Sequence, residues 1–154
     1  MLEQIKNNNE TDFIAAMENA LKRAEINYSF KDIDGVRMFI LVFNTGNLPY
    51  IELKMIVEPD GDVTDRICLA KRVETNKHIK ILFLLNNLNE RYKFAKFVLD
   101  KDKDLYIYRD DRLQDSSNEW CDRMFANAAM LVRIADESSP EIMKLVWSDM
   151  SDET

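Results

Sequence analysis

The sequence has few of the residues that most often mark turns, disulfides or metal sites. Its 154 residues include three glycines, three prolines, two cysteines and one histidine. So little glycine and proline indicates long helices and strands joined by short connections. Cys68 and Cys121 stand alone on different expected elements, which is typical of small buried side chains in a reducing compartment. His78 has no second ligand at a suitable spacing, so we expect no metal site.

Basic residues are outnumbered by acidic ones, and long apolar runs are scarce. Lys and Arg total 21 against 28 Asp and Glu, which gives a net charge of -7. An acidic surface repels the phosphates of nucleic acids and anionic lipids. The apolar runs, such as residues 81–85, are far shorter than a membrane span. The first nine residues also lack the apolar core of a signal peptide. We therefore expect a cytoplasmic protein that binds neither nucleic acid nor membrane.

Recognisable catalytic motifs are absent from the sequence. It has no glycine-rich phosphate loop and no serine in a nucleophile elbow. A cysteine–histidine pair is formally available, but no known signature surrounds Cys68 or Cys121. We expect no catalytic residues and no cofactor, and an uncharacterised enzyme stays as an alternative.

The segment from Asp100 to Asp104 resembles the start of a calcium-binding loop. Asp100, Asp102 and Asp104 match its first three ligand positions. The sixth position, which should be glycine, is Leu105, and the twelfth, which should be glutamate, is Asp111. We favour a solvated hairpin turn, and a calcium- or ligand-dependent sensor stays as an alternative.

The first half of the chain changes from a helical period to a strand period. Apolar residues at helical spacing predict a helix over residues 9–26, capped by Asn9. Alternation then predicts strands on both sides of the turn signal Asp34-Gly35. The strand after that turn has apolar residues on both faces: Val36, Met38, Ile40 and Val42 on one, and Phe39, Leu41 and Phe43 on the other. Two more strands follow, separated by a turn at residues 58–62.

The second half repeats the pattern of helix and hairpin. A helix that is apolar around most of its circumference is predicted from Thr75 or Asn76 to about Asn89. A strand pair follows, with its turn at residues 100–104. The capping box Ser116-x-x-Glu119 predicts a helix over residues 116–135, and Pro140 predicts a separate short helix after Ser139.

These elements predict the α+β class in the order α-β-β-β(-β)-α-β-β-α-α. Hairpin connections imply an antiparallel sheet of about five to six strands with helices packed against it. The chain has no long linker and no internal repeat, so residues 1–154 are expected to form one domain.

Residues 79–104 carry the most distinctive pattern. It comprises Leu84-Leu85-Asn86-x-Leu88-Asn89 and Tyr92-x-Phe94-x-Lys96-Phe97-x-Leu99-Asp100. This pattern resembles the signature of the YbjN-type bacterial family, whose fold is similar to that of type III secretion chaperones. The resemblance implies a small α/β domain that often dimerises and has no known catalytic residues. It also implies a chaperone-like protein or a candidate regulator of bacterial sensory transduction. The asparagines themselves favour a structural role at a helix-to-strand corner.

The apolar content of the middle helix and the first hairpin exceeds what one molecule easily hides. We therefore expect a homodimer through Ile81, Leu84 and Leu85. A protein or peptide partner is expected to lie against Phe13, Met17, Phe39 and Phe43. The resulting hypothesis is a non-catalytic, chaperone-like or regulatory module that binds a polypeptide through apolar surface.

Overall fold

The computed structural model describes residues 2–112 and 118–148, with side chains from residue 13 onward. Its elements are α1 (Leu2–Arg23), β1 (Tyr28–Ile33), β2 (Val36–Phe43), β3 (Ile51–Val57), β4 (Asp62–Ala70), a 3₁₀ turn (Thr75–Lys77), α2 (His78–Arg91), β5 (Lys96–Leu99), β6 (Leu105–Arg112) and α3 (Asn118–Val146). These strands form one antiparallel sheet in the order β1-β2-β3-β4-β6-β5. The predicted α+β class with a sheet of five to six antiparallel strands is confirmed.

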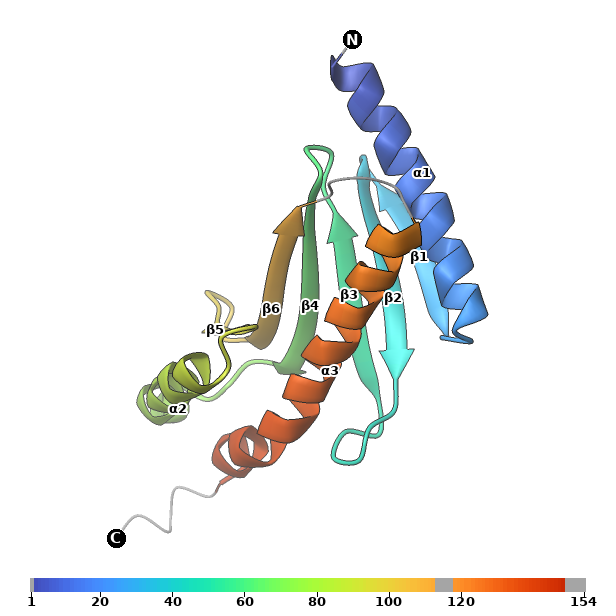
Figure 1. Ribbon diagram of the computed structural model, residues 1–154. Helices are drawn as coiled ribbons and strands as arrows, with labels where there is room; N and C mark the ends of the chain where they lie inside the picture. The colour runs from blue at the N-terminus through green and yellow to red at the C-terminus, as the bar shows by residue number, and fades with distance from the viewer. Residues whose placement is uncertain (1, 113–117, 149–154) are drawn as a thin grey trace, which may run out of the picture.

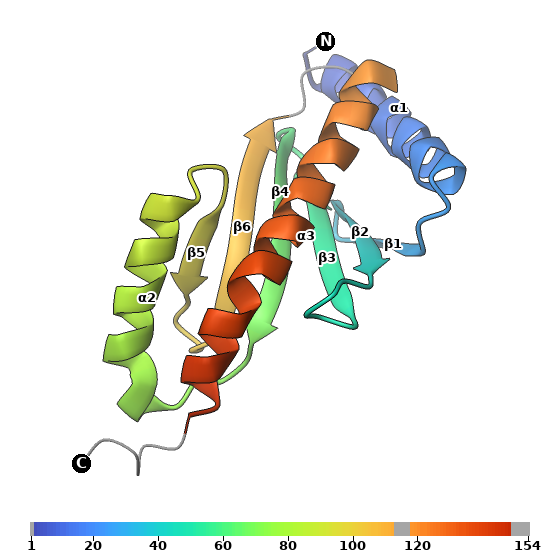
Figure 2. The same ribbon diagram turned by 60° about the horizontal axis from the view of Figure 1, so that its bottom comes forward.

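The three helices pack on one face of the sheet. Figure 1 shows α3 crossing the strands obliquely, with α1 at the β1 end. Figure 2 shows α2 beside β5, at the other end of the sheet. One continuous core lies between the helices and the sheet, and every strand from β2 to β6 contributes buried side chains to it. Within the described residues, no element covers the opposite face.

The first hairpin forms as its turn sequence predicts. Asp34 and Gly35 both have positive φ, at 53° and 82°, and they join Ile33 directly to its partner Val36. Two consecutive residues with positive φ match the right-handed twist of the strands that they connect, and asparagine, aspartate and glycine tolerate that backbone best. The turn therefore sets the register of β1 and β2, and with it which side chains of β2 point to each face.

Helix α1 begins earlier and ends earlier than the sequence predicts. Its range, Leu2–Arg23, places Asn9 inside the helix, so the expected cap at Asn9 is wrong. At the other end Glu25 has a φ of 55°, and the Ile26 amide donates to the Leu21 carbonyl at 3.1 Å. The Glu25 amide donates to Lys22 at 3.1 Å, which completes a left-handed helix cap. Glycine usually occupies that position, so its absence hid the helix end from sequence analysis.

Helix α3 continues through Pro140, which corrects the prediction of two separate helices. Proline removes the amide that would bond the Asp136 carbonyl. That carbonyl instead accepts hydrogen bonds from Ser139 Oγ at 3.0 Å and from Asn47 Nδ2 at 3.1 Å. The helix survives because a serine and a loop asparagine replace the missing donor. The predicted capping serine, Ser116, lies outside the described residues.

The corner between α2 and β5 confirms the structural role predicted for Asn89. Its Nδ2 donates to the Phe97 carbonyl at 3.0 Å, and its Oδ1 accepts from the Phe97 amide at 2.6 Å. Because β5 is an edge strand, these two backbone groups have no neighbouring strand on that side. The Asn89 amide therefore takes the place of a strand partner.

Candidate functional site

The uncovered face of the sheet has an apolar patch at its β1 end. Strand alternation sends every second residue of β2 to this face, because Phe39 and Leu41 point into the core. The register places Ile33 beside Val36, and Ile56 beside Met38. We use the name apolar patch for Ile33, Val36, Met38, Ile40, Val42 and Ile56. Ile33 is 59% exposed and the others are partly buried.

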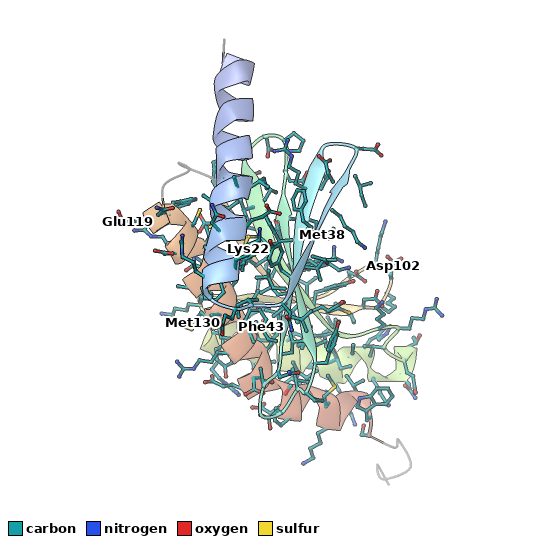
Figure 3. The ribbon with its side chains drawn as sticks, turned by 90° about the vertical axis from the view of Figure 1, so that its right-hand side faces the viewer. Lys22, Met38, Phe43, Asp102, Glu119 and Met130 are labelled. Atoms are coloured by element: carbon teal, nitrogen blue, oxygen red, sulfur yellow. The ribbon has the colours of Figure 1, made fainter. Side chains whose placement is uncertain are left out.

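The patch lies opposite the helices. Figure 3 shows Met38 on one side of the strands, with Phe43 and Met130 toward the helical side. An apolar surface on a sheet face is normally covered by a helix or a second sheet. Here no described element of the chain provides that cover, so the patch is available to a partner.

The other end of the same face carries cations and tyrosines. The Arg66 guanidinium carbon lies 3.8 Å from the ring centre of Tyr106 and 5.4 Å from that of Tyr108. Lys96 Nζ lies 5.8 Å from the Tyr108 ring and 3.6 Å from an Asp110 carboxyl oxygen. Cation–ring contacts of this kind are attractive and favour these side-chain positions. The face thus has its aliphatic residues mainly on β2, with Lys31 and Lys54 directly opposite Met38 and Ile40 on the neighbouring strands, and its aromatic rings on β6.

A second exposed apolar surface lies on α2. Ile79, Leu82 and Phe83 are 72%, 52% and 71% exposed. With Asn86 they line a shallow groove of about 300 Å³. Their spacing, i, i+3, i+4 and i+7, aligns them along one side of the helix. We call these four residues the α2 seam.

The residues predicted to bind a partner belong to the core instead. Phe13, Met17 and Phe39 are buried in the core, and Phe43 is partly buried against it. The sequence correctly indicated that β2 is apolar on both faces. It did not indicate which face the helices cover, and the prediction selected the covered one. The face of β2 that the helices leave open carries Val36, Met38, Ile40 and Val42.

The structure also places the residues predicted to form the dimer in the core or at its edge. Ile81 and Leu85 are buried against the sheet, and Leu84 is partly buried at the edge of the core. Ile81 and Leu85 are therefore not exposed to another chain in this fold, whereas part of the Leu84 side chain is. The residues left exposed on the same helix are those of the α2 seam, one or two positions away. The homodimer itself stays a prediction.

A buried polar cluster between the sheet and α3 was not predicted. Asp65 on β4 is 2% exposed and lies directly opposite Arg109 on β6. Its Oδ1 has no hydrogen-bond partner among the described residues. Arg109 also contacts Asp111 at 3.6 Å, and Asn127 of α3 donates to Asp111 at 3.4 Å. Burial raises the pKa of Asp65 to about 7; the Arg109 charge opposes that rise and the Asp111 charge adds to it.

The Asp100–Asp104 segment forms the turn between β5 and β6. Asp100 Oδ1 accepts backbone hydrogen bonds from Asp102 at 2.9 Å and from Asp104 at 3.0 Å, and Asp104 Oδ1 accepts one from Arg72 at 2.8 Å. These oxygens hold the hairpin together, as aspartates commonly do in turns. Across the described part of the chain, no group of three or more His, Cys, Asp or Glu side chains could hold a metal ion.

The single histidine and the two cysteines occupy unrelated places. His78 Nε2 lies 2.8 Å from the Val73 carbonyl at the start of α2. Cys121 is buried in α3, whereas Cys68 is only partly buried, on the uncovered face. Burial raises the pKa of the Cys68 thiol, which disfavours the reactive thiolate. The prediction that both cysteines are buried thus holds for Cys121 alone.

The helices of the described residues include none with the length and apolar character needed to cross a membrane.

The fold and its surfaces define an antiparallel α+β domain that is covered by helices on one face and open on the other. Comparison with protein families matches residues 14–138 to YbjN, described as "Putative bacterial sensory transduction regulator". The match spans most of the chain, so the protein belongs to the YbjN family. No curated protein and no solved structure matches the chain.

Proposed function

We propose that this YbjN protein is a non-catalytic regulator that works by binding a polypeptide through the uncovered face of its sheet. The observation that supports the proposal is the apolar patch. It gathers six aliphatic or methionine side chains on neighbouring strands, away from every described helix. Covering such a surface is favourable by about 25 cal/mol for each Å² of apolar area removed from water.

The chemistry of the face favours a polypeptide over a small molecule at the patch. The patch lies mainly on β2, which is paired with a strand on each side, so it offers mostly side chains and few free backbone groups. An amphipathic helix or the apolar face of another sheet fits a surface of this kind. The family description as a regulator of sensory transduction is consistent with such an exchangeable partner.

Self-association through the α2 seam is a companion proposal. We propose that the α2 helices of two copies pair antiparallel, about a two-fold axis that passes between Leu82 and Phe83. In this pairing Leu82 of each copy contacts Phe83 of the other. The seam and the apolar patch lie on different elements, so a dimer formed through α2 would leave the sheet face open. The cytoplasmic location and the chaperone-like character expected from the sequence belong to the same proposal.

Met38→Lys tests the sheet face, with Met130→Lys as the matched control. Both variants place a charge at a methionine outside the core, but Met130 lies on α3 and Met38 on the open sheet face (Figure 3). Each tagged variant is used to isolate bound proteins from the source cell, followed by mass spectrometry. We expect a polypeptide that is recovered with the wild type and with Met130→Lys and lost at least about tenfold with Met38→Lys, because burial of a lysine charge in an apolar contact is costly. Equal recovery with all three chains would contradict the proposal.

A further inference from the structure

Strands β3 and β4 separate at one end and leave a pocket between them. Their pairing runs from Val57 and Val63 to Leu53 and Ile67 and stops there. Beyond that point each strand pairs only with its outer neighbour, β3 with β2 and β4 with β6. The gap is a pocket of about 420 Å³. That volume lies within the usual range for sites that hold small molecules.

Part of the lining of this pocket, which we call the apolar wall, is apolar and aromatic. It includes Leu48, Leu69 and Trp147, and Trp147 is 77% exposed just after the end of α3. Tyr106 contributes a ring from β6. An exposed tryptophan at the rim of a pocket offers a large apolar surface at little cost in side-chain entropy.

Three cations lie along the same pocket. Lys54 and Arg66 are direct cross-strand neighbours on β3 and β4, and Lys71 follows the end of β4. Within the described residues, none of the three forms an ion pair with a carboxylate. The one acidic residue of the pocket, Glu52, accepts a hydrogen bond from the Tyr50 hydroxyl at 3.1 Å.

Placing two like charges opposite each other on adjacent strands is unfavourable. In this chain it is also unexpected, because acidic residues outnumber basic ones by seven. The Arg66 guanidinium is held on the rings of Tyr106 and Tyr108, and its Nε is buried without an acceptor among the described residues. An anion between Lys54 and Arg66 would turn this repulsion into attraction.

We propose that the pocket between β3 and β4 binds a small organic anion. Its charged group, a carboxylate or a phosphate, lies between Lys54 and Arg66, and its apolar body lies against Leu48, Leu69 and Trp147. The apolar wall is the reason to expect an organic ligand and not a simple inorganic anion, which would leave that wall in water. The proposal goes beyond the binding of a polypeptide and does not depend on it, because the pocket and the apolar patch share no residue.

Octanoate is a suitable probe, with octanamide as its neutral counterpart and inorganic phosphate as the anion without an apolar body. Isothermal titration measures each affinity, and tryptophan emission reports on the pocket rim. We expect octanoate to bind and to shift the emission of Trp147 to shorter wavelength, while octanamide and phosphate bind at least about tenfold more weakly. The shift should vanish in Trp147→Phe, since the other tryptophan, Trp120, is buried at the start of α3.

Lys54→Gln tests the charge contact, with Lys96→Gln as the matched control. Both lysines are exposed on the same sheet face, but Lys96 is paired with Asp110. We expect Lys54→Gln to weaken octanoate binding about tenfold or more and Lys96→Gln to leave it unchanged. The proposal is overturned if octanoate does not bind the wild-type chain, if octanamide binds as well as octanoate, or if both substitutions have the same effect.

Discussion

Asp65 is a carboxyl group in a position where most proteins place an apolar residue. It lies among buried side chains under α3, and its strand partners are Met55 on one side and Arg109 on the other. Arg109 divides its charge among several neighbours. It pairs with Asp111 at 3.6 Å, and its guanidinium carbon lies 3.8 Å from the centre of the Phe94 ring. Burial therefore dominates at Asp65 and favours the protonated form.

Asp65 should make the protein less stable as the pH rises from about 4 to 7. The pKa of this carboxyl is about 7 in the folded chain against an ordinary value of 3.8, so the folded state holds a proton that the unfolded state releases. This stabilisation is complete below the pKa of Asp65 in the unfolded chain. It is lost as the pH rises through the pKa of Asp65 in the folded chain. Asp65→Asn keeps the shape of the side chain without its charge. The free energy of unfolding of Asp65→Asn, relative to that of wild type, should therefore rise by about 2–4 kcal/mol from pH 5 to pH 8.

Urea unfolding of both proteins at pH 5 and pH 8 measures this change. Asp110→Asn is the control, because it removes an exposed carboxyl from the neighbouring strand. It should show no comparable change between the two pH values. A constant difference between Asp65→Asn and wild type at both pH values would show that Asp65 is already ionised at pH 5.

At the scale of elements, patterns that depend on neighbouring residues were predictable. The Asp34-Gly35 turn, the Asp100–Asp104 turn and the Asn89 corner all follow from local backbone needs, and the structure has all three. The ends of α1 and the continuity of α3 were not predictable in this way. Glu25 occupies a position that usually carries glycine, and Asn47, far away in the sequence, supplies a donor that compensates for Pro140.

Helix α2 should respond differently to changes on its two sides. Phe83 belongs to the exposed seam, whereas Leu85 is buried against the sheet. If the seam joins two copies, Phe83→Lys should convert a dimer into a monomer with little loss of stability. Leu85→Ala should instead lower the free energy of unfolding by about 2–5 kcal/mol, the usual cost of truncating a buried leucine.

Light scattering at tens of micromolar gives the oligomeric state, and urea unfolding gives the stability. Wild-type protein that is monomeric under these conditions would contradict the dimer proposal. So would a Phe83→Lys variant that stays dimeric, since the contact would then lie elsewhere on the molecule.

At the scale of the whole molecule, the position of the helices decides which apolar residues are core. The two sides of β2 are similar in sequence, with Val36, Met38, Ile40 and Val42 against Phe39, Leu41 and Phe43. Sequence periodicity separates these two sets but cannot rank them, because either set could face the helices. On α2 likewise, the circumference is so apolar that the buried side depends on the docking of the helix against β5 and α3. The class of fold was thus predictable, whereas the exposed surface depended on long-range packing.

The central claim is that a polypeptide occupies the uncovered face of the sheet. The most direct measurement is photo-crosslinking in the source cell from p-benzoylphenylalanine placed at Ile40, in the middle of β2, and separately at Met130, on α3. We expect a covalent adduct with a polypeptide from position 40 and none from position 130. Equal labelling at both positions, or labelling at neither in cells where the protein is active, would contradict the account.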